Sequence, residues 1–107
     1  MPVHTRSIHD RRAGDRRYQD LKQRLVDEWL ERGGTPPAPD INQETDAQGR
    51  LVNVVVSWDE WADLDAQTRS ELIVDALREA KGVEAVQELA LAMGITSAEG
   101  VRLARGA

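Results

Sequence analysis

The stretch LVNVVVSWDEWADLDAQTRSELIVDALREA, residues 51–80, decides the fold of this chain. Its first seven residues carry valine on both alternating faces, which suits a strand at the centre of a sheet better than one at the edge. After Asp65 the apolar positions recur every three or four residues, as on the buried face of a helix: Leu72, Ile73, Ala76, Leu77 and Ala80. Asp65 is a suitable N-cap for that helix, and Gly82 is a suitable end. The stretch therefore predicts a strand that leads through an acidic turn into an amphipathic helix.

The residues on either side of this strand predict its immediate neighbours. Residues 41–45 and 51–57 flank Asp46-Ala47-Gln48-Gly49, where Gly49 can adopt the positive φ that a short hairpin turn needs. Ser57 and Glu60 have the spacing of a capping box, which predicts one helical turn over residues 58–63. Within it, Trp58 and Trp61 are expected to pack against the strand-to-helix corner.

Further towards the N-terminus, residues 16–32 have the pattern of a second amphipathic helix. Its apolar positions are Tyr18, Leu21, Leu25, Val26, Trp29 and Leu30. Asp15 is a suitable cap and Gly33 a suitable end, and the following GGTPPAPD, residues 33–40, predicts an extended connection.

Residues 83–93, VEAVQELALAM, have two interpretations. Their composition favours a helix, whereas the alternation of Gln87, Leu89, Leu91 and Met93 with the residues between them is typical of a strand. A third strand would cover the amphipathic helices better than a hairpin alone, so we predict a strand over residues 84–93 and keep the helix as the alternative. Thr96-Ser97-Ala98-Glu99 is a second capping-box pattern, which predicts a helix to about Arg105 and a break near Gly94.

These elements predict an α+β fold: a small two-layer sandwich in the order α-β-β-(short α)-α-β-α, with a three-stranded sheet backed by helices. The 107 residues suffice for one domain, which we expect over residues 16–107, preceded by a flexible basic arm at residues 1–15. The first 17 residues contain five arginines against Asp10 and Asp15, although the net charge of the chain is −5.

Several classes of function are disfavoured. The chain has no cysteine, which removes thiolate metal sites and cysteine nucleophiles. Its two histidines, His4 and His9, both lie in the arm, and no phosphate-binding loop or catalytic constellation is present. The acidic residues of the turn, Asp59, Glu60, Asp63 and Asp65, are explained by the preference of carboxylates for helix starts. We therefore expect no enzyme activity, no metal and no cofactor. With no apolar run long enough for a bilayer, we expect no membrane association and a cytoplasmic location.

Residues 54–99 resemble the BolA-like proteins. The resemblance is carried by Val56-Ser57, Trp61, Leu64, Arg69, Ala76-Leu77 and Thr96-Ser97-Ala98-Glu99. It implies a three-stranded sheet backed by helices, similar to type II KH folds. BolA-like proteins commonly place an iron–sulfur cluster ligand, a histidine, in the last strand, where this chain has Gln87, and the loop at residues 46–49 contains no histidine or cysteine. No Gly-x-x-Gly loop of the KH type occurs.

Two hypotheses for function follow. The first is a non-enzymatic regulatory or protein-interaction module that binds an unknown protein or itself, with Trp29, Trp58 and Trp61 as candidate partner-binding residues and Trp29 and Trp58 as candidate exposed anchors. The alternative is a nucleic-acid-binding module that uses the basic arm. Its candidate residues are Arg6, Arg11, Arg12, Arg16 and Arg17, assisted by Arg50 and Arg69.

Overall fold

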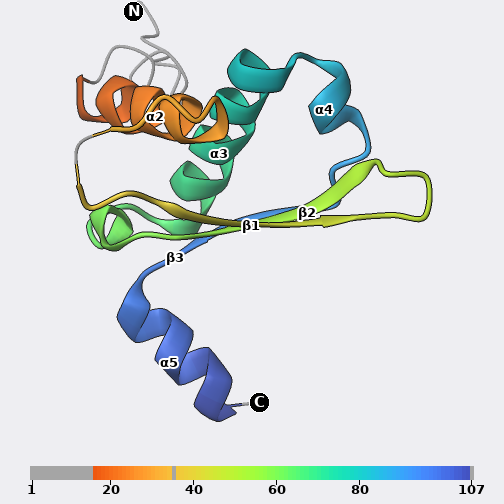
Figure 1. Ribbon diagram of the computed structural model, residues 1–107. Helices are drawn as coiled ribbons and strands as arrows, with labels where there is room; N and C mark the ends of the chain where they lie inside the picture. The colour runs from red at the N-terminus through yellow and green to blue at the C-terminus, as the bar shows by residue number, and fades with distance from the viewer. Residues whose placement is uncertain (1–15, 35, 107) are drawn as a thin grey trace, which may run out of the picture.

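Three strands form one mixed sheet in the order β1-β2-β3, and helices cover one of its faces (Figure 1). The computed structural model describes residues 16–34 and 36–106. Along the chain the elements are α2 (Arg16–Trp29), β1 (Asp40–Thr45), β2 (Leu51–Ser57), the 3₁₀ turn η1 (Asp59–Trp61), α3 (Ala66–Lys81), α4 (Glu84–Gln87), β3 (Leu91–Ile95) and α5 (Ser97–Gly106). The α+β class and the three-stranded sheet predicted from the sequence are confirmed.

The valine-rich strand β2 lies at the centre of the sheet, as predicted. It pairs antiparallel with β1 across the hairpin and parallel with β3 on its other side. Asp46 closes the hairpin turn by accepting hydrogen bonds from the backbone amides of Gln48 and Arg50, while Gly49 takes a φ of 80°. The bond from the Arg50 amide is the main reason why the pKa of Asp46 lies below its ordinary value.

The core lies between the sheet and the pair α2 and α3. Val54 and Val56 turn their side chains to the helices and are fully buried. The predicted stripe of α3 meets them, since Leu72, Ile73, Ala76 and Leu77 are also fully buried and Ala80 packs at the margin. From α2 the core receives Tyr18, Leu21, Leu25, Val26 and Trp29. Both predicted amphipathic helices therefore bury the face that their sequence indicated.

The ends of the helices agree with the sequence in part. Asp65 caps α3 as predicted, because its carboxylate accepts a hydrogen bond of 2.7 Å from the Thr68 amide, and Gly82 follows the helix with a φ of 97°. The helix α2 ends at Trp29, earlier than predicted, and the chain turns away through Glu31 and Gly33, both with positive φ. The predicted cap Asp15 lies outside the described residues.

Two local predictions were wrong. Ser57 and Glu60 do not form a capping box, because Ser57 is held in the sheet as the last residue of β2 and Glu60 instead forms an ion pair of 2.9 Å with Arg24. Residues 84–93 are not one strand either. Glu84–Gln87 form the short helix α4, and β3 begins only at Leu91, where the parallel register with Asn53 starts. Gln87 therefore lies in a helix rather than in the last strand.

The break predicted near Gly94 lies two residues later, at Thr96, because β3 runs through Gly94 to Ile95 before α5 begins. Neighbouring side chains approach the strand closely at Gly94. A Cβ atom at position 94 would lie 2.7 Å from Trp61 Nε1 and 3.0 Å from Arg69 Cβ. The glycine is therefore required by packing, not by a turn.

Candidate interaction surface

The second face of the sheet is not covered by a helical layer. Figure 1 shows α2, α3 and α4 on one side of the sheet, while α5 projects from the other. Because side chains alternate along a strand, this open face receives the residues that do not point into the core. Its apolar part comprises Val55 on β2 and Leu91, Met93 and Ile95 on β3, with Met93 paired directly to Val55. Leu91 is 41% exposed, so part of this stripe is available to a partner.

Acidic residues border the apolar stripe on the β1 side. Asp40 is paired to Ser57, and Glu44 is paired to Asn53, so both carboxylates follow the same alternation onto the open face. Asp40 and Glu44 are both exposed. The open face therefore combines an apolar stripe with an acidic margin.

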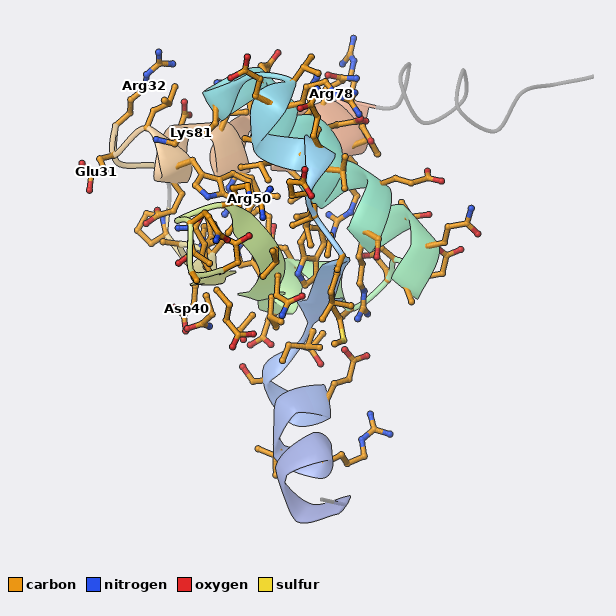
Figure 2. All side chains as sticks on the ribbon, turned by 90° about the vertical axis from the view of Figure 1, so that its right-hand side faces the viewer. Glu31, Arg32, Asp40, Arg50, Arg78 and Lys81 are labelled. Carbon is orange, nitrogen blue, oxygen red and sulfur yellow. The ribbon has the colours of Figure 1, made fainter. Side chains whose placement is uncertain are left out.

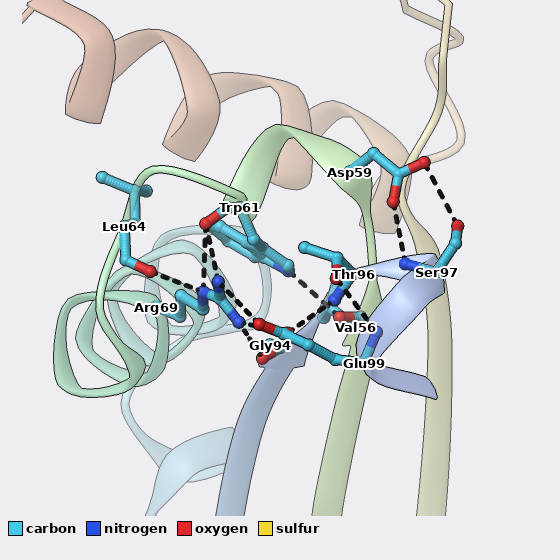
Figure 3. A network of polar contacts seen from close by, with 9 residues as sticks. All are labelled: Val56, Asp59, Trp61, Leu64, Arg69, Gly94, Thr96, Ser97 and Glu99. Carbon is cyan, nitrogen blue, oxygen red and sulfur yellow. Dashed lines mark hydrogen bonds and ion pairs between the residues drawn. The ribbon is translucent and has the colours of Figure 1, made fainter. Parts of the chain in front are cut away.

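The first turn of α5 is fixed to the body by a polar network (Figure 3). The Arg69 guanidinium, on α3, donates to the carbonyls of Trp61, Leu64 and Gly94 and forms an ion pair of 2.6 Å with Glu99. Glu99 also accepts a hydrogen bond from the Thr96 amide, while the Glu99 amide donates to the Thr96 hydroxyl. This confirms the second predicted capping box, which the arginine attaches to α3 and η1.

A second contact fixes the same turn. The backbone amide and the hydroxyl of Ser97 both donate to the carboxylate of Asp59, at 2.8 and 3.1 Å. Two carboxylates, Asp59 on the body and Glu99 on the helix, therefore hold the start of α5 in one orientation. The hydrogen bond from the Arg69 side chain, followed by that from the Thr96 amide, lowers the pKa of Glu99 to about 2, so this ion pair is present at neutral pH.

Beyond its first turn, α5 stands apart from the rest of the molecule. In Figure 2, turned by 90° from the first view, it hangs below the sheet with no other described ribbon beside it. Val101 is 54% exposed, and Arg102 is exposed as well. A shallow pocket of about 500 Å³ lies where β3, α5 and the start of α3 meet, and its lining includes Ala66, Arg69, Met93, Ile95 and Arg102. We use the name docking surface for the open-face residues Val55, Leu91, Met93 and Ile95 together with Val101 and Arg102 of α5.

The three tryptophans do not belong to this surface, which corrects the expectation that Trp29 and Trp58 are exposed anchors. Trp29, Trp58 and Trp61 are 7%, 3% and 0% exposed. Each indole also donates a hydrogen bond within the chain: Trp29 to Gln43, Trp58 to the Pro37 carbonyl and Trp61 to the Val56 carbonyl. Trp58 and Trp61 pack edge to face with ring centroids 5.2 Å apart, as expected for the strand-to-helix corner.

Of the arginines proposed for nucleic-acid binding that the structure describes, Arg17, Arg50 and Arg69 are engaged by other groups of the chain. Arg69 is 6% exposed and fully engaged in the network at the start of α5, so it does not face a phosphate. Arg50 pairs with Asp46 at 2.8 Å, and Arg17 pairs with Asp63 at 2.8 Å. Arg16 is exposed at the start of α2, whereas Arg6, Arg11 and Arg12 lie outside the described residues.

The residues of the docking surface were not singled out in the sequence as a site. The sequence shows that Leu91 and Met93 alternate with other residues, but it does not show which face of the sheet they occupy. The strand was predicted over residues 84–93, and a shift in strand bounds or register changes which side chains are exposed. Among the residues that the structure describes, no group of three or more potential ligands is placed to hold a metal ion. No described helix combines the length and the apolar character needed to cross a bilayer.

Comparison with family models, with curated proteins and with solved structures found no match for this chain.

Proposed function

We propose that this chain is a non-enzymatic regulatory or protein-interaction module on a BolA-like scaffold, and that it binds its partner through the docking surface. The observation that carries the proposal is the sheet face left without a helical layer, with an apolar stripe bordered on its β1 side by acidic residues. Apolar surface of this kind, bordered by polar residues, is typical of sites where another protein binds.

The use of the polar side chains supports a role without catalysis. Arg69, Glu99 and Asp59 are charged groups at the start of α5, and each is engaged in fixing this helix to the body. A catalytic acid or base must be able to contact a substrate, whereas these three side chains form hydrogen bonds and an ion pair with other groups of the chain.

The residues that carry the resemblance to BolA-like proteins support the proposed scaffold. Trp61, Leu64, Arg69, Thr96 and Glu99 come from four segments of the chain and meet in the network of Figure 3. The pattern therefore has a structural reason here, since it joins α3, η1, β3 and α5. The cluster chemistry of that family is not part of the proposal, because Gln87 lies in α4 and the turn at residues 46–49 offers no imidazole or thiol.

Site-specific photo-crosslinking tests the proposal. A photoreactive amino acid placed at Leu91 or at Val101 should form covalent adducts with a protein in the native lysate, because both positions are exposed on the docking surface. Val83 is the matched control, since it is 59% exposed but adjoins α4 on the helical side of the sheet. Adducts of equal yield from Val83, or none from Leu91 and Val101, would contradict the proposal.

The alternative, nucleic-acid binding by the basic arm, is separated from it by a salt titration with single-stranded RNA and duplex DNA. Contacts from several arginines to phosphates predict a steep loss of affinity as salt is added, with a logarithmic slope of about −0.9 per neutralised phosphate on duplex DNA. The docking-surface proposal predicts no binding to either probe at low salt.

A further inference from the structure

We infer that the partner is a second copy of this chain, and that each copy lays its α5 across the open sheet face of the other. The inference rests on the proposed function, because it uses the same docking surface and names what covers it. Four observations carry it: the anchoring of α5, its exposure, the charges on the two surfaces and their dimensions.

The anchoring of α5 prevents the helix from covering its own sheet. Its first turn is tied to Arg69 through Glu99 and to Asp59 through Ser97. These contacts direct the rest of the helix away from the face from which it emerges (Figures 1 and 2). The open face and the projecting helix are therefore complementary parts that one copy cannot join.

The exposure of α5 indicates that something packs against it. A helix of 10 residues is marginal in water unless one of its faces is covered. Here the described side chains beyond the first turn, Val101 and Arg102, are exposed. Three large apolar side chains are exposed in the described part of the chain. Two of them, Leu91 and Val101, belong to the docking surface.

The charges of the two surfaces are opposite in sign. After Glu99, which is neutralised by Arg69, the sequence of α5 contains Arg102 and Arg105 and no acidic residue. The open face of the sheet carries Asp40 and Glu44 along its β1 margin. A helix from a second copy would thus bring positive charge to an acidic margin while Val101 meets the apolar stripe.

The dimensions of the two surfaces also agree. A helix of 10 residues is about 15 Å long. Three strands with a spacing of about 4.8 Å span about 10 Å between the outer strands, so the six residues beyond the anchored first turn, about 9 Å long, reach across most of the sheet. In a two-fold symmetric pair the same contact forms twice, which doubles the area that one helix would bury alone.

Sedimentation equilibrium of the full-length chain tests the inference. We expect a concentration-dependent mass that approaches twice 11.9 kDa. Leu91→Lys places a positive charge in the apolar stripe, and Val101→Glu places a negative charge on the part of the incoming helix that meets this stripe. Each variant should weaken the dimer by at least about tenfold, because an unpaired charge is brought into an apolar contact. The matched controls are Val83→Lys and Val83→Glu, which should leave the dimer unchanged.

Mixing the two variants is the decisive experiment. In a mixed dimer, the unchanged helix of the Leu91→Lys copy meets the unchanged face of the Val101→Glu copy, and the two introduced charges of opposite sign meet in the other contact. The mixture should therefore dimerise more tightly than either variant alone. Far-UV circular dichroism of each variant verifies that it is folded, and Arg102→Glu, a change at an exposed position, gives an independent loss of affinity.

Three outcomes would overturn the inference. The first is a wild-type chain that stays monomeric up to on the order of 100 µM, where even weak specific interfaces are occupied. The second is a dimer that is weakened no more by Leu91→Lys and Val101→Glu than by the Val83 controls. The third is two variants that do not rescue one another. In each case, crosslinks from Leu91 and Val101 to a different protein would leave the proposed function standing.

Discussion

At the scale of single residues, Gly94 shows how closely three elements meet. Its buried position in β3 faces the indole of Trp61 on η1 and the stem of Arg69 on α3. We predict that Gly94→Ala destabilises the fold by about 2–4 kcal/mol, since the added methyl group forces Trp61 away and weakens its hydrogen bond to the Val56 carbonyl. Urea denaturation measures the change.

The matched control for this substitution is Gly34→Ala. No atom lies within 4 Å of the position that its Cβ would occupy, and its φ is not in the left-handed region. Its free energy of unfolding should stay the same or rise by up to about 1 kcal/mol. Equal losses from the two substitutions would contradict the packing argument.

The lowered pKa of Glu99 predicts that the stability of the fold depends on pH. This pKa is lowered from 4.5 to about 2 in the folded chain, first by the hydrogen bond from Arg69. A carboxyl with a depressed pKa contributes stability that is fully present above 4.5 and is lost as the pH falls towards 2. Urea midpoints of the wild type and of Glu99→Gln should therefore differ most at neutral pH and converge near pH 2. A difference that does not change with pH would disprove this assignment.

At the scale of elements, the junction of α3, η1, β3 and α5 depends on one side chain. The planar guanidinium of Arg69 serves three carbonyls and one carboxylate at once, which an ammonium group cannot do. We predict that Arg69→Lys costs about 2–3 kcal/mol of unfolding free energy, because buried carbonyls of neighbouring elements lose their donor.

Arg78→Lys is the control for this prediction, since Arg78 lies on the same helix with an exposed ion pair of 3.4 Å to Asp75. Its effect on stability should stay within about 0.5 kcal/mol. Chemical denaturation of both variants under the same conditions makes the comparison. If both substitutions have the same small effect, the junction is not held by Arg69.

At the scale of the whole molecule, one core holds α2, α3 and the sheet together. The fully buried Ile73 on α3 lies in the same cluster as all three tryptophans. We predict that Ile73→Ala lowers the free energy of unfolding by about 2–5 kcal/mol through loss of apolar contact and a residual cavity. Tryptophan fluorescence should follow one transition in the wild type and in the variant, because the three indoles report on one core.

Val74→Ala, at the next position of the helix, supplies the comparison. Val74 is only half-buried and loses less surface from the core, so its substitution should cost less than that of Ile73. A second fluorescence transition, or an equal cost at both positions, would show that the core is not one unit.

The sequence by itself determined the class of the fold, the central position of the valine-rich strand, the two amphipathic helices and the caps at Asp65 and Thr96. These features are local, because periodicity and capping depend on residues a few positions apart. The bounds of α4 and β3 and the burial of Trp29 and of Arg69 depended on contacts between distant segments.

Only the tertiary structure decided which side of the sheet stays uncovered and where α5 points. Leu91 and Met93 alternate in the sequence, but their face is fixed by the parallel register with Asn53 and Val55. The direction of α5 is fixed by Arg69, 30 residues before its partner Glu99. Neither a register nor a long-range ion pair is encoded in the neighbouring residues, which is why the docking surface appeared only once the chain was folded.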